Sequence, residues 1–121
     1  MVARRRIDET AGRQAVERWR SDPAGLDRAS LATAVRFALE EVAARAPGNS
    51  VEVRVPPFGV TQCIPGPRHT RGTPPNVVET DAATWLALVT GRLRWADAIV
   101  GGTVSASGTR TDLAELLPLW D

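Results

Sequence analysis

The sequence predicts an α+β domain in which a small, mostly antiparallel sheet carries helices packed on one face. The hydrophobic period changes from about 3.6 residues to 2 after residue 49, so helical segments come before the first strands. The next strand-like segments are separated by turns and loops, and one further strand returns only after two helices. Clustered strands with short turns favour an antiparallel sheet over regularly alternating βαβ units.

The chain opens with two predicted helices. Asp8 can cap the first, which ends at Asp22-Pro23-Ala24-Gly25. The second, over residues 27–45, is the clearest element because apolar side chains recur at helical spacing while charged ones face away. The inward positions are Ala11, Ala15, Val16 and Trp19 in the first helix and Leu31, Val35, Ala38, Leu39 and Val42 in the second; Arg28, Arg36, Glu40, Glu41 and Arg45 face outward.

A hairpin and a third strand follow. Residues 50–55 alternate valines with Glu52 and Arg54, which is typical of a strand with one buried and one wet face. Residues 56–59 form a turn, and residues 60–64 are the hairpin partner. Prolines at this junction indicate a sheet edge. Residues 65–75 have no periodicity and predict a loop, and residues 76–80 predict a short strand.

The last third of the chain contains two helices, a strand and a final helical segment. Asp81 caps a helix that ends at Gly91, and a shorter helix ends at Gly101-Gly102. Residues 103–107 alternate as a strand, and residues 112–117 predict one or two helical turns that Pro118 ends. Trp120 is predicted to fold back over the sheet, to cover a cavity mouth or to enter a partner subunit. The inward residues are Trp85, Leu86, Leu88, Val89, Trp95, Ala98, Ile99, Leu113, Leu116 and Leu117.

Size and charge place limits on the function. The 121 residues are enough for a single domain over 1–121, in which the arginine-rich residues 1–6 are expected to be a disordered tail. The formal charge of +1 gives no reason to expect nucleic acid. The longest stretch without charge, 55–67, contains four prolines, so no membrane insertion is expected. A single cysteine and no signal-like apolar segment predict a cytoplasmic protein.

Residues 81–120 resemble the C-terminal half of the sterol carrier protein family. The resemblance rests on the Asp81-capped helix, on the segments 90–93 and 98–102, on the strand that follows with Gly108, and on the Leu-rich end. Residues 53–81 are similar to short actinobacterial proteins labelled as sterol-carrier-like orthologues. The resemblance implies a layered domain around an apolar cavity, no cofactor, no catalytic residue, and a lipid or other apolar small molecule as ligand. The short strands and the Pro-rich loop predict a modest cavity.

Two sets of candidate site residues follow from these patterns. The cavity is expected to be lined by Val53, Val55, Val78, Leu86, Val89 and Ile99. The loop residues Arg68, His69, Thr70, Arg71 and Gly72 could hold a phosphate or carboxylate, because arginine offers a bidentate fork and glycine lets backbone N–H groups approach. The alternative is a solvated loop whose arginines pair with acids such as Glu79. The loop is not a Walker motif, because it has no lysine.

The remaining reactive side chains do not assemble an active site in the sequence. His69 is the only histidine, so an ordinary zinc site is not expected and the metal and cofactor predictions are none. Cys63 and His69 could form a nucleophile and base, but Cys63 lies within a predicted strand, where a small buried side chain is the commoner role.

Three functions remain open at this stage. The first is a non-enzymatic lipid or small-molecule binder. The second is an interaction or scaffold domain that has no cavity and contacts a protein partner, which could be a second copy of the chain. The third is an enzyme that uses His69 with Arg68 or Arg71 on an anionic substrate.

Overall fold

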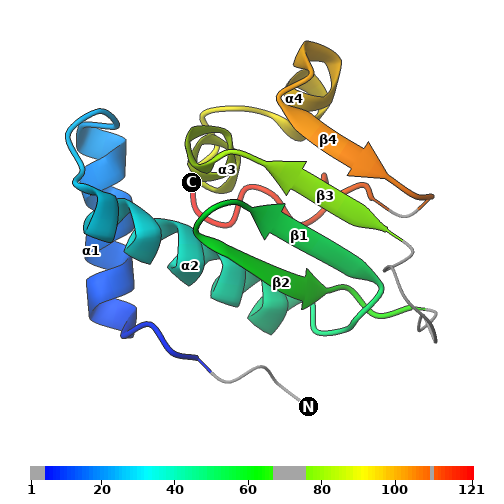
Figure 1. Ribbon diagram of the computed structural model, residues 1–121, viewed down its shortest axis with the longest axis horizontal. Helices are drawn as coiled ribbons and strands as arrows, with labels where there is room; N and C mark the ends of the chain where they lie inside the picture. Colours follow the sequence, from blue (N-terminus) through cyan, green and yellow to red (C-terminus); the bar gives the residue numbers. More distant parts are fainter. Residues whose placement is uncertain (1–4, 67–75, 110) are drawn as a thin grey trace.

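The computed structural model describes residues 5–66, 76–109 and 111–121, and over these residues the predicted α+β class is confirmed (Figure 1). The elements run in the order α1 (Glu9–Ser21), α2 (Arg28–Arg45), β1 (Val51–Val55), β2 (Gly59–Cys63), β3 (Val77–Thr80), α3 (Ala82–Val89), α4 (Trp95–Gly101) and β4 (Val104–Ser107). Residues 1–4, 67–75 and 110 lie outside the described part.

The strands form one sheet in the order β2-β1-β3-β4. The outer pairs are antiparallel, with Val53 opposite Thr61 and Val78 opposite Ala106. The central pair, β1 with β3, is parallel and places Val53 beside Val78. The sheet is therefore mostly antiparallel, and β2 and β4 are its two edge strands.

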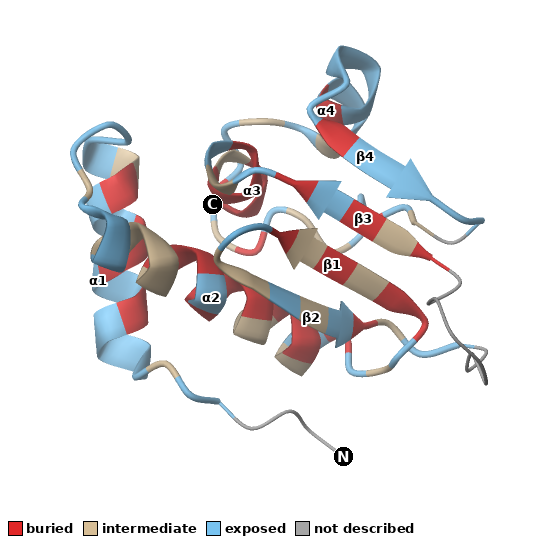
Figure 2. Ribbon diagram, viewed as in Figure 1, coloured by how far each residue is buried: buried red, intermediate tan, exposed pale blue. Residues whose placement is uncertain are grey.

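Helices α2 and α3 cover one face of the sheet, and α1 packs on α2 without reaching the sheet (Figure 1). The alternation of β1 explains this layering, because Val51, Val53 and Val55 are buried while Glu52 and Arg54 are only partly covered (Figure 2). The hydrophobic core contains the aromatic side chains Trp85 and Phe37, both almost fully buried. In the described part of the chain, no helix covers the opposite face of the sheet (Figure 1).

An aspartate caps each of the first three helices, as the sequence predicts for Asp8 and Asp81; Asp27, predicted as the first residue of its helix, is the third cap. The carboxylates of Asp8, Asp27 and Asp81 accept hydrogen bonds from the backbone N–H groups of Ala11, Ser30 and Thr84, respectively. Each bond satisfies one of the N–H groups that have no partner inside a helix. At the other end of α3, Gly91 has φ +81°, as expected of a glycine that ends a helix.

The predicted inward face of α1 is wrong at one position. Ala11 is exposed and its neighbour Gly12 is buried, because α2 places the Phe37 ring directly against the Gly12 backbone. A β-carbon built on Gly12 would lie 2.3 Å from Phe37 Cγ. The contact needs a position without a side chain, and hydrophobic periodicity does not score glycine as buried.

The hairpin partner and the final helical segment differ from the prediction. The hairpin partner is Gly59–Cys63, one residue earlier than expected, because Ile64 has φ +67° and its N–H bonds to the carbonyl of Ala46. Residues 112–117 form no helix. They make one turn, in which the N–H groups of Leu116 and Leu117 bond to Leu113, and the chain then extends to meet α3.

Glu40 and Glu41 were predicted to face outward, but both carboxylates have partners in the structure. Glu40 accepts hydrogen bonds from the backbone N–H groups of Arg6 and Ile7. Glu41 forms ion pairs with Arg5 and with Arg45, the latter with Nε to Oε2 at 2.7 Å. These bonds hold residues 5–7 against α2, although Arg5 and Arg6 belong to the segment that the sequence predicted as a tail.

The ion pairs of Glu41 predict a stability that falls in acid. Burial alone would raise the pKa of the Glu41 carboxyl, but the hydrogen bonds from Arg5 and Arg45 outweigh it and lower the pKa below its ordinary value of 4.5. A lowered pKa stabilises the fold above that value, and the contribution is lost as pH falls through the folded-state pKa. Glu41→Gln should therefore cost about 1 kcal/mol in urea unfolding at pH 7 and much less near pH 3. An equal cost at both pH values would contradict this.

Candidate functional site

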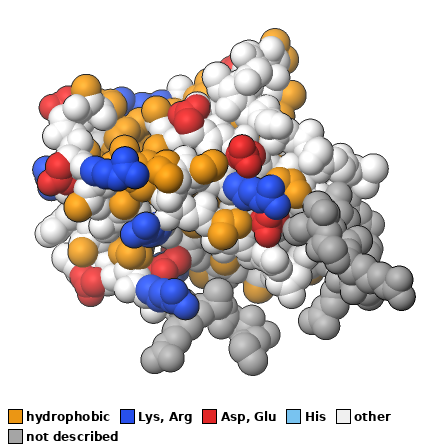
Figure 3. Space-filling model, viewed as in Figure 1, with side chains coloured by type: hydrophobic (Ala, Val, Ile, Leu, Met, Phe, Trp, Pro, Cys, Tyr) orange, Lys and Arg blue, Asp and Glu red, His pale blue; other side chains and the backbone are white. Residues whose placement is uncertain are grey.

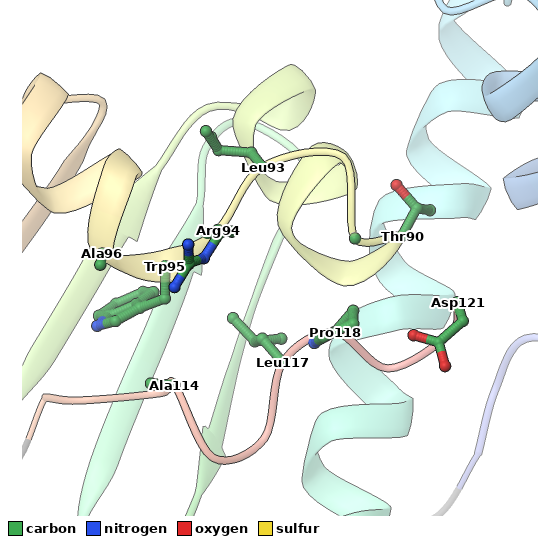
Figure 4. A pocket seen from close by; sticks show the side chains of 10 residues that line it. Thr90, Leu93, Arg94, Trp95, Ala96, Ala114, Leu117, Pro118 and Asp121 are labelled. Atoms are coloured by element: carbon green, nitrogen blue, oxygen red, sulfur yellow. The ribbon is translucent and has the colours of Figure 1, made fainter.

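A cleft of about 490 Å³ lies between the α3–α4 connection and the C-terminal segment (Figure 4). Its volume falls in the range of small-molecule sites. Apolar side chains form much of the wall, and one guanidinium and one carboxylate are the charged groups. The lining residues are Thr90, Gly91, Leu93, Arg94, Trp95, Ala96, Ala114, Leu117, Pro118 and Asp121.

The end of α3 shapes one wall of the cleft. After Val89 the chain turns at Gly91, and the N–H groups of Arg92 and Leu93 both bond to the carbonyl of Ala87. The positive φ of Gly91 makes this turn possible, and Pro118 packs opposite it, with Cγ 3.5 Å from the place of a β-carbon. The turn leads directly into Arg94 and Trp95 at the start of α4.

The C-terminal segment forms the other wall and is fixed at several points. The N–H groups of Leu119 and Trp120 bond to the carbonyl of Val89, at 2.9 and 3.0 Å. The Trp120 ring stacks on Phe37 with centroids 5.6 Å apart, and the Arg45 guanidinium donates to the Leu119 carbonyl at 2.7 Å. Trp120 thus folds back onto α2, on the helical side of the sheet.

Arg94 and Trp95 give the cleft its chemical character. In Figure 4 Arg94 and Trp95 lie next to each other at the start of α4, Leu117 lies on the C-terminal segment opposite them, and Asp121 lies beyond Pro118 at the other end. Arg94 makes no side-chain capping bond to α4 and no ion pair with any described residue. A free guanidinium beside an indole and a leucine suits a molecule that is apolar along its length and anionic at one end.

The predicted cavity residues lie in two different places. Val53, Val55, Val78, Leu86 and Val89 belong to one hydrophobic core and have at most 1% of their surface exposed. Ile99 lies apart from them on α4 and is 40% exposed. None of the six lines the cleft of Figure 4. An internal cavity at these positions stays a prediction.

The predicted anion loop, with Arg68, His69, Thr70, Arg71 and Gly72, lies outside the described residues. Glu79, named as a partner for its arginines, is exposed on β3. The enzyme hypothesis based on His69 therefore stays a prediction as well.

Cys63 is a buried structural side chain, as its position in a strand predicted. It lies on the helix-facing side of β2, opposite Val51, with no exposed surface. Burial raises the pKa of its thiol to about 11, so the thiol stays protonated at neutral pH. Because the thiolate is the reactive form, Cys63 is a poor nucleophile.

The described part of the chain has neither a metal-binding cluster nor a membrane-spanning helix. Within it, no cluster of three or more His, Cys, Asp or Glu side chains could hold a metal ion. No helix in the same residues is long and apolar enough to cross a bilayer.

Arg94, Leu117 and Pro118 were not identified as site residues from the sequence. Arg94 lies between a glycine turn and a short helix. A single arginine in such a position belongs to no recognisable sequence motif. Its role depends on the C-terminal segment, which comes to it from more than twenty residues away. The family resemblance over residues 81–120 was the one signal that pointed to this part of the chain.

Comparison with known proteins identifies a family. The family model described as "Bacterial SCP ortholog" matches residues 27–119, which is well over half of the chain. The match begins at the cap of α2 and includes the whole cleft except Asp121. A search of curated proteins found no match.

Proposed function

Because the chain belongs to the family of bacterial SCP (sterol carrier protein) orthologs, we propose that it is a non-enzymatic module that binds an apolar small molecule with an anionic end. The family is generally one of carrier domains without catalysis. The ligand is proposed to lie in the cleft between Trp95 and Leu117, with its acid group at Arg94.

The observation that carries this proposal is the unpaired guanidinium of Arg94 beside two apolar side chains. Of the four arginines that lie over aromatic rings in the described chain, Arg5, Arg45 and Arg92 also have a polar partner, whereas Arg28 forms no ion pair with a described residue. Among the described residues Arg94 has no such partner, so its charge is available to a ligand. The apolar wall supplies affinity, and the charge supplies orientation.

We predict that dodecanoate binds the chain and that Arg94→Gln weakens this binding about tenfold, the cost of one charge-assisted hydrogen bond at a partly exposed site. Isothermal titration calorimetry measures the affinity. Dodecanol, which has the same alkyl chain without the charge, should bind more weakly and show no dependence on Arg94.

Arg13→Gln is the matched control, because Arg13 lies on the exposed side of α1 and Glu9 is its ion-pair partner among the described residues. It should leave dodecanoate binding unchanged. Equal affinities of the wild type and Arg94→Gln for dodecanoate would place the ligand elsewhere. Absence of binding, together with a ligand-free mass for protein purified from its own host, would contradict the carrier function.

A further inference from the structure

A second groove, of about 510 Å³, runs beside the edge strand β2, well away from the cleft at Arg94. Its floor is α2, one side is β2 with the β1–β2 turn, and the other side is the N-terminal segment. The lining residues are Arg6, Ile7, Arg36, Leu39, Glu40, Phe58, Gly59, Val60 and Thr61. The groove adjoins the outer edge of β2, which has no neighbouring strand among the described residues.

The register shows which backbone groups of β2 are free. The N–H of Glu52 bonds to Asn76, on the β3 side, so Val51, Val53 and Val55 direct their N–H and C=O groups toward β2. Their partners are Cys63, Thr61 and Gly59. The intervening residues, Val60 and Gln62, therefore direct their backbone groups away from the sheet. Among the described residues no strand lies beyond β2.

The groove has an apolar floor at the right level for an added strand. Gly59 has no side chain, and Leu39 of α2 comes within 3.1 Å of where its β-carbon would be. Ile7 and Phe58 are half-buried at the two ends, and Val60 is 58% exposed. Helix α2 and the N-terminal segment thus extend past the sheet edge and form an apolar surface on which an added strand could pack.

The charges around the groove are mainly positive. Arg36 Nε donates to the Phe58 carbonyl at 2.7 Å, and the Arg28 guanidinium lies over the Phe58 ring at 5.3 Å. Neither these two side chains nor that of Arg6 forms an ion pair with a described residue. Glu40 already accepts the N–H groups of Arg6 and Ile7. Figure 3 shows blue arginines standing among orange apolar side chains on this side of the molecule.

We propose that this groove binds an extended segment of another protein that alternates apolar and acidic residues and pairs with β2 as a fifth strand. The Val60 and Gln62 backbone groups would supply the main-chain hydrogen bonds, and the arginines would select acidic side chains. The apolar side chains would rest on Leu39 and Ile7. A second copy of the chain fits less well, because pairing β2 with β2 would bring the same arginines together.

The test is to pan a random heptapeptide phage library against the full chain and to measure synthetic versions of enriched peptides by fluorescence polarisation. We expect enrichment of alternating apolar and acidic residues. Val60→Pro should weaken binding at least tenfold, because it removes an N–H that faces the incoming strand while leaving the bonds to β1 intact. Val60→Thr, which keeps that N–H, should change the affinity less than twofold, and Arg36→Glu should weaken it at least tenfold.

Four outcomes would overturn the proposal. The first is that panning against the wild type enriches no peptides relative to panning the same library against Val60→Pro. The second is enriched peptides that bind Val60→Pro as tightly as the wild type. The third is concentration-dependent dimerisation that Val60→Pro abolishes, which would assign the edge to a second copy. Binding to phosphatidylglycerol vesicles that Arg36→Glu reduces and Val60→Pro leaves unchanged would also count against a strand partner.

Discussion

Replacing Trp85 with alanine is expected to lower the free energy of unfolding by about 3–5 kcal/mol. Trp85 lies on α3 with no exposed surface, and its indole N–H donates to the Val35 carbonyl of α2 at 3.3 Å. The side chain therefore joins the two helices that cover the sheet. Its removal leaves a large cavity and loses this second hydrogen bond to a helical carbonyl, and urea unfolding followed by circular dichroism measures the loss.

Trp85→Phe is the matched control for this substitution. It keeps an aromatic ring in the core but loses the indole N–H and part of the volume, so a cost of about 1–2 kcal/mol is expected. The two variants should differ by roughly the cost of the cavity. If Trp85→Ala cost less than about 1 kcal/mol, the position of Trp85 at the centre of the core would be wrong.

The helices and strands could be predicted because their signals are local. Asp8, Asp27 and Asp81 each precede a helix, and a capping carboxylate needs only the N–H three residues further along. The alternation in residues 51–55 likewise requires only one buried face. Local chemistry of this kind can be recognised without knowing the fold.

The candidate site could not be predicted in the same way, because it is formed by segments that are distant in the sequence. The carbonyl of Val89 accepts the N–H groups of Leu119 and Trp120, and this contact brings Leu117 and Pro118 to Arg94. No spacing in the sequence encodes that bond. Residues 112–117 have helical periodicity, but they form only a single turn. The residues that follow them bond to the Val89 carbonyl and stack on the Phe37 ring, which requires an extended chain.

The groove beside β2 is likewise formed by segments that are distant in the sequence. Its prolines at the hairpin turn did indicate a sheet edge, which the strand order confirms. Residues 6–7 lie beside this edge because Glu40 of α2 accepts their backbone N–H groups. The helical pattern predicted that Glu40 faces solvent. Charged residues at the boundary of an amphipathic face are where pattern-based predictions fail, because tertiary partners decide their burial.

Gly12→Ala should destabilise the fold by about 1–3 kcal/mol, although alanine is the better helix former. The new β-carbon would lie 2.3 Å from Phe37 Cγ and Cδ1, and the ring cannot move away because it is 1% exposed and stacked on Trp120. Helices α1 and α2 would have to separate. Since Trp120 anchors the segment that lines the cleft, the same change should weaken dodecanoate binding.

Gly101→Ala is the control that separates packing from backbone effects. Gly101 also lies in a helix, α4, but a β-carbon there would meet no atom within 4 Å. The same substitution should therefore stabilise the protein by about 0.5–1 kcal/mol. Thermal or urea unfolding of both variants would show opposite signs. If both were stabilising, the close approach of Phe37 to α1 would be refuted, and with it the link from α1 through Trp120 to the cleft.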